Sequence, residues 1–303
     1  MPSLDPAPTL APMSVSRRVG LLSLSLLFVP ACARDGDETL TIRMSEGTAL
    51  AFDLTRDGEQ IVFDLLGQLW LVPASGGEAR AITDAVRDTA EDLDPAFAPD
   101  GRRVAFRGER NGRVGLWLLD LDSATPRQLT QLPRPEGEEG APAWSPDGRA
   151  LLFSRSLPPD TAGGRWRSDL VLRELVSGNE RTLALDTFTA IRDPAWVGGN
   201  GEIGFVALPG RGAPGGRVWV VDTMRRAPRP VTVPTQVAAA PAFSPGGGEV
   251  AYFAPDSAGN PQVWLQLLDL DRAATGPARQ VTRHDDVAPT RIRWTRSGLS
   301  VSV

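Results

Sequence analysis

Lysine is absent from the 303 residues of the chain, and cysteine, histidine and tyrosine each occur once. The single cysteine, Cys32, excludes an internal disulfide. The single histidine, His284, excludes sites that need several imidazoles, as most metallohydrolase centres do. The sequence also has neither an H-x-H pair nor the G-x-S-x-G motif of serine hydrolases. We therefore expect no catalytic residue, no metal centre, no cofactor, and a protein that is not an enzyme.

The charge balance narrows the class of partner. All 32 basic residues are arginine, 37 residues are acidic, and the net charge is −5. This balance gives no sign of a basic face for nucleic acid or for an anionic membrane. We interpret the exclusive use of arginine as codon bias rather than as a recognition device. Glycine (31) and proline (27) are frequent instead, which favours a fold of many short strands and turns.

The N-terminal segment SRRVGLLSLSLLFVPAC, residues 16–32, has the three parts of a secretory signal. A basic pair precedes an apolar run of 11 residues, which is too short to span a membrane as a helix, and small residues lead to Cys32. The letters VPAC resemble a bacterial lipobox, which implies cleavage before Cys32 and attachment of lipid there. An ordinary signal peptide that contains a cysteine is the alternative.

This segment predicts a location on the periplasmic side of the cell envelope. Residues 1–32 form the signal, residues 33–38 (ARDGDE) form a solvated tether, and the only membrane contact is the N-terminal lipid. Ala33 follows the cysteine where an inner-membrane lipoprotein commonly has aspartate, which favours an outer-membrane anchor. Secretion without an anchor is the outcome if the lipobox is not processed.

A unit of about 43 to 53 residues recurs through residues 39–303. Its first part is a short strand, a turn of the S-P-D-G type and a second strand that mostly ends in Phe or Tyr. The copies are FDLTRDGEQIVF (52–63), PAFAPDGRRVAF (95–106), PAWSPDGRALLF (142–153), PAWVGGNGEIGF (194–205), PAFSPGGGEVAY (241–252) and IRWTRSGLSVSV (292–303). The turn glycines are assigned as Gly58, Gly101, Gly148, Gly201, Gly247 and Gly298.

Each unit continues with a third and a fourth strand. The third strands read GQLWLV, VGLWLL, SDLVLR, GRVWVV and PQVWLQ, and the fourth read ARAIT, PRQLT, RTL, RPVT and ARQVT. Tryptophans recur at one place in the first or the third strand, which predicts a core between neighbouring units rather than a sugar-stacking surface. Only Trp166 lies outside this pattern.

These periods predict an all-β fold, a β-propeller of four-stranded antiparallel blades, with about six blades and the last one incomplete. The sixth unit has only its first two strands. The extra strand TLTIRM (39–44) would then serve as the outer strand of that sixth blade. Because a blade that stops at its second strand exposes unpaired backbone groups, we expect the chain to be a fragment of a longer product.

The segments PAWSPDGRALLF and LWLLDLDSATPRQLT resemble the TolB-type (WD40-like, PD40 repeat) β-propeller family over roughly residues 45–303. Residues 45–83 are similar to the N-terminal propeller of extracytoplasmic amidohydrolases. The resemblance implies a non-catalytic envelope propeller that binds a protein or a ligand. The alternative is the truncated propeller of a metal-dependent amidohydrolase, or of a prolyl-oligopeptidase-type peptidase, whose C-terminal catalytic domain is absent from this sequence.

Two groups of residues are candidate binding surfaces. The loops before the first strands are acidic, which predicts a face for a basic partner or a hard cation, with solvated loops as the alternative. Its members are Asp88, Glu91, Asp92, Asp94, Glu136, Glu138, Glu139, His284, Asp285 and Asp286. The second group is Arg165, Trp166 and Arg167 in a long loop, because an aromatic residue between arginines is typical of a protein-binding hot spot. An envelope protein, or a C-terminal domain absent from this sequence, is the expected partner.

Overall fold

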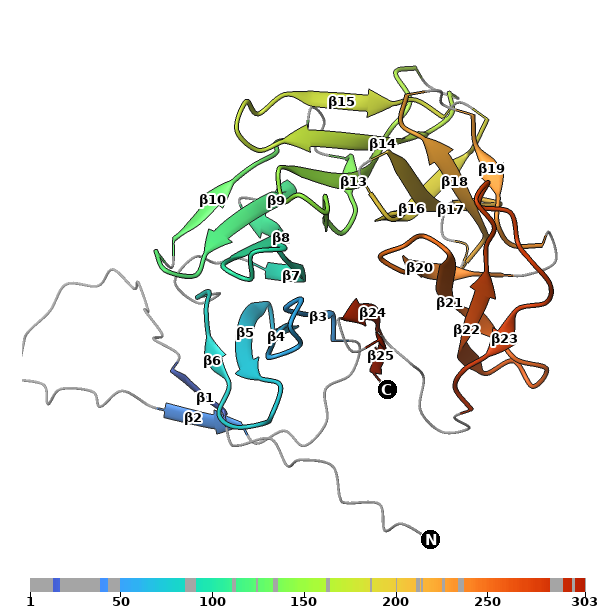
Figure 1. The fold of residues 1–303 in the computed structure, drawn as a ribbon. Helices are drawn as coiled ribbons and strands as arrows, with labels where there is room; N and C mark the ends of the chain where they lie inside the picture. Colours follow the sequence, from blue (N-terminus) through green and yellow to red (C-terminus); the bar gives the residue numbers. More distant parts are fainter. Residues whose placement is uncertain are drawn as a thin grey trace, which may run out of the picture.

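The computed structural model describes most of the chain from residue 50 onward, together with two short N-terminal strands. The described residues are 13–16, 39–42, 50–84, 91–110, 113–123, 125–132, 136–161, 164–185, 187–199, 201–210, 213, 215–224, 227–233, 237–283, 291–295 and 298–302. They contain strands and turns, and small antiparallel sheets stand around a common centre (Figure 1). The prediction of an all-β propeller is confirmed.

Five sheets have the order expected of blades, with each strand paired to the next along the sequence. Blade 1 contains β3 (Phe52–Leu54), β4 (Gln60–Leu65), β5 (Gln68–Pro73) and β6 (Arg80–Ala81). Blade 2 contains β7 (Glu91–Phe97), β8 (Arg103–Arg110), β9 (Arg113–Asp120) and β10 (Pro126–Gln128). In blade 3 the first strand is split into β11 (Glu138–Glu139) and β12 (Ala143–Trp144), and β13 (Ala150–Leu157), β14 (Arg167–Glu174) and β15 (Glu180–Leu183) follow.

The other sheets complete the ring. Blade 4 contains β16 (Ala190–Trp196), β17 (Glu202–Leu208), β18 (Arg217–Asp222) and β19 (Arg229–Pro230). Blade 5 contains β20 (Ala239–Phe243), β21 (Glu249–Pro255), β22 (Pro261–Leu267) and β23 (Arg279–Gln280). The sixth unit is the hairpin of β24 (Arg291–Thr295) and β25 (Gly298–Ser302), which lies between blades 5 and 1 in Figure 1.

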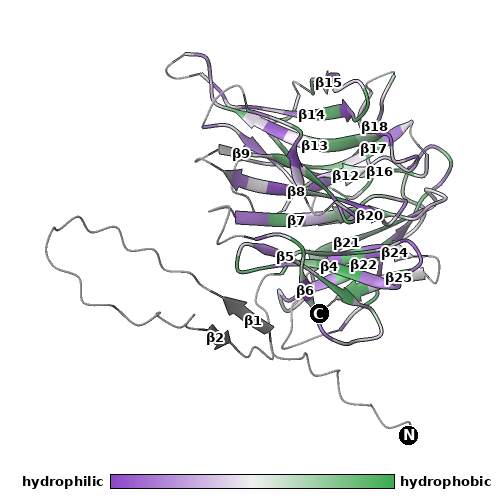
Figure 2. Cartoon of the chain, turned by 90° about the vertical axis from the view of Figure 1, so that its left-hand side faces the viewer, coloured by the Kyte–Doolittle hydropathy of each residue, from purple (hydrophilic) through white to green (hydrophobic). Residues whose placement is uncertain are grey.

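The core lies between blades. Fully buried Phe106 of β8 packs in one cluster with Val62 and Leu69 of blade 1, and fully buried Tyr252 of β21 packs with Val206 of blade 4. The hairpin joins the same arrangement, because Ile292 packs against blade 5 residues. Figure 2 shows the apolar stretches within the blade strands. Since each blade has two faces to bury, neighbouring blades must supply the contact surface.

The turn after the first strand has the same geometry in blades 1, 2, 3 and 5. In blade 3 the amide of Gly148 donates to the carbonyl of Ser145 at 2.8 Å, and Gly148 has φ +70°, a region that side chains other than glycine rarely adopt. Gly58, Gly101 and Gly247 repeat this geometry. In blade 4 the amide of Val197 donates to the carbonyl of Glu202, as the amide of Ser145 donates to the carbonyl of Ala150 in blade 3. When the two blades are aligned on these bonds, Gly201 matches Arg149, which lies one position after the turn glycine of blade 3.

The threonine of the fourth-strand motif has a structural role in four blades. The hydroxyl of Thr83 accepts a hydrogen bond from the amide of Leu69 at 2.9 Å, and Thr130 accepts from Leu116 at 2.8 Å. Thr232 and Thr282 do the same for the third strands of blades 4 and 5. The hydroxyl thus satisfies a third-strand donor just beyond the short fourth strand, which explains why the motif recurs.

The N-terminal strand is placed differently from the prediction. Residues 39–42 form β2 (Thr39–Ile42), which pairs in antiparallel fashion with β1 (Met13–Ser16). The prediction that residues 39–44 complete the sixth blade is therefore wrong for this structure. The β1 partner lies inside the predicted signal, so cleavage before Cys32 would remove it. Within the described residues, no helix is long and apolar enough to cross a membrane.

Candidate functional site: the central cavity

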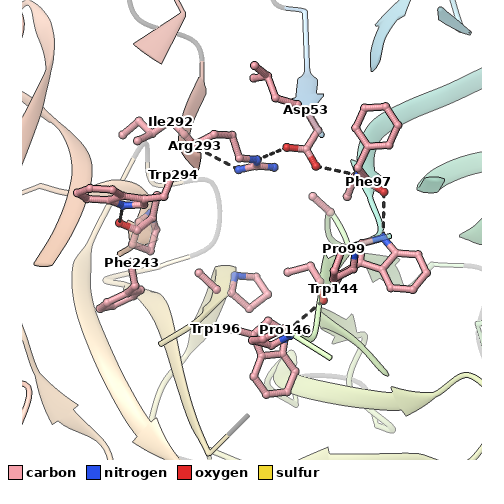
Figure 3. Close-up of a pocket in the computed structure, with 18 of the residues that line it drawn as sticks. Asp53, Phe97, Pro99, Trp144, Pro146, Trp196, Phe243, Ile292, Arg293 and Trp294 are labelled. Carbon is pink, nitrogen blue, oxygen red and sulfur yellow. Dashed lines mark hydrogen bonds and ion pairs between the residues drawn. The ribbon is translucent and has the colours of Figure 1, made fainter. Parts of the chain in front are cut away.

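A cavity of about 440 Å³ lies at the centre of the ring. All six units line it through their first strands, and blades 1 to 5 also through the turns that follow, which include Arg56 and Pro245. Figure 3 shows Pro99 and Pro146 from two of these turns. The volume falls within the usual range for pockets that hold small molecules. The repeated PAW and PAF segments converge here because the first strand of every blade is the innermost.

Aromatic side chains at one repeated position form much of the wall. Figure 3 shows Phe97, Trp144, Trp196, Phe243 and Trp294 around the cavity. Each tryptophan also ties its unit to the preceding one through a hydrogen bond from Nε1 to a backbone carbonyl. The three bonds are Trp144 to Ala96 at 2.9 Å, Trp196 to Ala143 at 3.3 Å and Trp294 to Ala242 at 2.9 Å. The prediction that these tryptophans pack between units is confirmed, and the same side chains also face the cavity.

An ion pair joins the last unit to the first. Arg293 of β24 donates through Nε to Oδ1 of Asp53 in β3, and Asp53 is buried (Figure 3). The other carboxylate oxygen of Asp53 accepts a hydrogen bond from the amide of Phe97 at 2.8 Å. One carboxylate therefore connects the sixth unit, blade 1 and blade 2 at the cavity wall.

The backbone around the cavity is strained at equivalent places. Asp94, Asp193 and Ala240 have φ values of 52°, 50° and 46°, and each lies at a bulge three residues before the repeated aromatic position. Both aspartates have partners: Oδ2 of Asp94 accepts from Arg107 at 2.6 Å, and Oδ2 of Asp193 accepts from the amide of Ala240 at 3.0 Å. Residues other than glycine pay free energy for this conformation, which concentrates strain around the cavity.

Asp64 of blade 1 binds the backbone at the first strands of blades 1 and 2. Its oxygens accept hydrogen bonds from the amides of Ala51 and Asp94, both at 2.8 Å. Burial raises the pKa of Asp64 although these two donors favour the ionised form. The residue links blade 1 to blade 2 and lies outside the cavity lining.

Arg291 occupies in the sixth unit the position that Asp94 and Asp193 occupy in blades 2 and 4. It lines the cavity, and its Nε is shielded from solvent without a hydrogen-bond partner in the described part of the molecule. Burial, together with the nearby cation of Arg293, lowers the pKa of Arg291 to about 10, against the attraction of Asp53, Asp94 and Asp193. The guanidinium is still cationic at pH 7.

The residues of the predicted acidic face differ in burial in the structure. Asp92 and Glu139 are fully buried, so neither can be part of a solvent-facing surface, and the prediction is wrong for these two. Glu91, Glu136 and Glu138 are exposed. The acidic group lies at the beginning of the first strands, whereas the turns that line the cavity follow their ends. The described residues contain no cluster of three or more side chains suited to a metal ion.

Glu139 instead belongs to a buried network. It accepts two hydrogen bonds from Arg155, at 2.9 and 2.5 Å, and one from the hydroxyl of Thr130. Arg155 also pairs with Glu180 at 2.7 Å. Burial raises the pKa of Glu139 although Thr130 and Arg155 both favour its charged form. The network holds the split first strand of blade 3 against its neighbours.

The remaining predicted residues have varied placements. Cys32, Asp88, His284, Asp285 and Asp286 lie outside the described residues. Arg165 and Arg167 are exposed, Trp166 is partly buried between them, and Arg167 pairs with Asp169 at 2.8 Å. The loop from β13 to β14 that carries them is remote from the cavity lining, so the interface at Trp166 stays a prediction.

Sequence reasoning missed the cavity residues Asp53, Arg291 and Arg293. The signal that was available is a break in the repeat: five units have small or acidic residues at the Arg291 position, and only the sixth has arginine. The pairing of Arg293 with Asp53 spans 240 residues and depends on the closure of the ring.

Solved structures with the same architecture are numerous, although no family model and no curated protein matches this sequence. TolB from Acinetobacter baumannii has a TM-score of 0.58 and 19% identity, over 83% of this chain and 60% of that one. A putative TolB from Agrobacterium tumefaciens has a TM-score of 0.60 and 20% identity, over 80% of this chain and 83% of that one. The fold is that of a TolB-like β-propeller.

An enzyme has the same architecture. An oligogalacturonate lyase in complex with manganese has a TM-score of 0.58 and 16% identity, over 82% of this chain and 68% of that one. Because TolB-like propellers of similar shape thus include both TolB and a lyase, and all identities are 20% or less, the likeness defines the fold alone. The function must be argued from the cavity.

Proposed function

We propose that this protein is a non-catalytic binding protein of the cell envelope that holds its ligand in the central cavity of the propeller. The observation that carries the proposal is the cavity itself, about 440 Å³, which all six units line and to which five of them contribute an aromatic side chain. Pockets of this size and composition are suited to hold a ligand group. The scarcity of catalytic groups supports binding rather than turnover, because the sequence has one histidine and no nucleophile motif.

The envelope location rests on the N-terminal segment and on the likeness in fold to TolB. Export would place the propeller in the periplasm, and lipid on Cys32 would anchor it to the outer membrane. We expect the native protein to fractionate with the outer membrane. The Cys32→Ser variant should be found in the soluble periplasmic fraction or remain unprocessed. Recovery of the folded native protein from the cytoplasm contradicts the proposal.

Binding in the cavity is tested by photo-crosslinking in cells. A photoreactive amino acid at Pro146, which lines the cavity mouth, should yield a discrete crosslinked species. The same amino acid at Val176, which is 97% exposed in the turn after β14, is the matched control and should yield none. Equal products at both positions, or none at either, contradict a cavity ligand. Recovery of a ligand that the protein has chemically cleaved contradicts the proposal that the protein is non-catalytic.

The propeller of a larger hydrolase is the second candidate. It is favoured by the resemblance of residues 45–83 to amidohydrolase propellers. In that case the cavity would shape access to an active site supplied by another domain. A downstream coding sequence in the same reading frame that contains an H-x-H pair would favour this candidate over the first.

A further inference from the structure

We propose that Arg291 is the recognition residue of the cavity and binds the carboxylate of a ligand whose apolar body packs on the aromatic wall. This inference rests on the proposed function, since it assumes a ligand in the cavity. It assigns the ligand class, an organic carboxylate, and the residue that selects it.

The first argument is a shielded donor that lacks a partner. Arg291 lines the cavity, and its side-chain Nε is shielded from solvent without a hydrogen-bond partner among the described residues. A shielded N–H donor without a partner is costly, because it loses water and gains nothing in return. Such a group in a cavity wall is accounted for if a ligand supplies the missing acceptors.

The second argument is that the nearby carboxylates are already engaged. The acidic residues that interact electrostatically with Arg291 include Asp53, Asp94, Asp193 and Asp64. Asp53 binds Arg293, Asp94 binds Arg107 at 2.6 Å, and Asp193 binds Arg192 at 3.2 Å. Three of these carboxylates thus have another arginine beside them, and Asp64 is held by two backbone amides and lies outside the cavity lining, so none of the four forms an ion pair with Arg291.

The rim of the cavity also carries positive charge. Arg56 lines the cavity from the turn after β3 and is exposed, whereas the two aspartates of the lining, Asp53 and Asp193, are both paired. The cavity therefore presents net positive charge although the whole protein has a net charge of −5. This local reversal attracts an anion into the cavity.

The third argument concerns the shape and polarity of the ligand. The planar guanidinium fork matches a carboxylate in a two-point contact. The surrounding wall is made of tryptophan, phenylalanine, proline and alanine side chains, which favour an apolar body over a sugar or an inorganic ion. A free acid and the C-terminus of a peptide share this chemistry, and the test below separates them.

The test is calorimetric titration of the purified full-length protein, with tryptophan fluorescence as a second readout because Trp144, Trp196 and Trp294 line the cavity. The probes are N-acetyl-leucine, its amide N-acetyl-leucinamide, the peptide N-acetyl-Ala-Ala-Leu and inorganic phosphate. We expect binding of the two carboxylates and at least about tenfold weaker binding of the amide and of phosphate. Tighter binding of the peptide identifies a peptide C-terminus as the source, and tighter binding of N-acetyl-leucine identifies a small acid.

The variants are Arg291→Gln, Arg291→Lys and the control Arg127→Gln, which removes an exposed arginine of the outer strand β10 that does not line the cavity. We expect at least about tenfold weaker carboxylate binding in Arg291→Gln, an intermediate loss in Arg291→Lys, and native affinity in the control. Arg291→Lys keeps the test valid if the glutamine variant does not fold.

The inference is overturned if neither carboxylate binds, if the amide binds equally well, or if both Arg291 variants bind with native affinity. Its failure is distinguishable from that of the proposed function. A crosslink at Pro146 that persists at full yield in Arg291→Gln would mean that the cavity holds a ligand and that Arg291 does not select it.

Discussion

Arg293 of the last hairpin binds Asp53 of the first blade, and through this pair residues that are 240 positions apart hold the ring together. The carboxylate is buried, and its second oxygen is used by the amide of Phe97. Closure of the propeller thus depends on a polar link at the cavity wall as well as on the packing of Ile292 against blade 5.

Loss of this link should destabilise the whole ring. We expect Asp53→Ala to lower the free energy of unfolding by about 2 to 3 kcal/mol, because it leaves Arg293 and the amide of Phe97 without their acceptor. Chemical denaturation measures the change. The matched control is Asp122→Ala, which removes an ion pair with 71% and 69% exposed side chains and should leave the midpoint unchanged. Equal effects of the two substitutions would contradict the role of Asp53.

Replacement of Arg291 by methionine should stabilise the protein. The native pKa of Arg291, about 10, lies below the ordinary value for arginine, so the charged form is disfavoured by folding. The cost is present at every pH below about 10 and is relieved as the pH rises from there toward the ordinary pKa of arginine. We expect Arg291→Met to raise the free energy of unfolding by about 1 to 3 kcal/mol at pH 7. The gain should be constant between about pH 6 and pH 9 and shrink above about pH 10.

This gain would show that the cavity is built for binding at the expense of stability. Denaturation at each pH measures it, with Arg165→Met as the control for a general effect of removing an arginine. A lower stability of Arg291→Met at pH 7 would mean that Arg291 is structural.

The tryptophans that join neighbouring units should contribute through their ring nitrogens. We expect Trp144→Phe and Trp294→Phe each to lower the free energy of unfolding by about 1 to 2 kcal/mol, because each leaves a carbonyl of the preceding unit without its donor. Trp70→Phe is the control: its Nε1 bond to Leu65 is 3.4 Å long and lies within one blade. If Trp70→Phe lowers the free energy of unfolding as much as Trp144→Phe does, the smaller ring alone explains the effect.

The fourth-strand threonines allow a matched comparison. Thr83 accepts one hydrogen bond from a third-strand amide, whereas Thr130 accepts the equivalent bond and also donates to Glu139. Both Thr→Val variants leave an amide unsatisfied, and we expect Thr130→Val to cost about 1 kcal/mol more because the buried carboxylate also loses a donor. Thermal unfolding of the two variants measures the difference. Equal losses would mean that Glu139 gains nothing from Thr130.

The sequence by itself was enough for the architecture. The S-P-D-G turns, the third-strand tryptophans and the fourth-strand threonines are local signals, and each is repeated in sequence order, so the number of units and their strands followed from spacing. The tryptophans at the repeated first-strand position, Trp144, Trp196 and Trp294, were also predicted to lie between units, because a repeated apolar position in a stacked fold faces the next repeat.

Burial of the acidic loops was not predictable in this way. Asp92 and Glu139 read as loop residues, but the strands begin earlier than the hydrophobic pattern suggests, and Arg155 provides Glu139 with a buried partner. The strand at residues 39–42 was predicted, whereas its pairing with residues 13–16 was not, because strand propensity does not specify a partner.

The amino-acid sequence therefore determined the repeat, the strands and the layers between blades, since these depend on contacts between neighbouring segments. Only the tertiary structure decided what the centre of the ring contains. Closure brings Asp53 to Arg293 and leaves Arg291 at the cavity, with its Nε lacking a hydrogen-bond partner among the described residues. No local pattern reports which charges meet when the two ends of a ring come together.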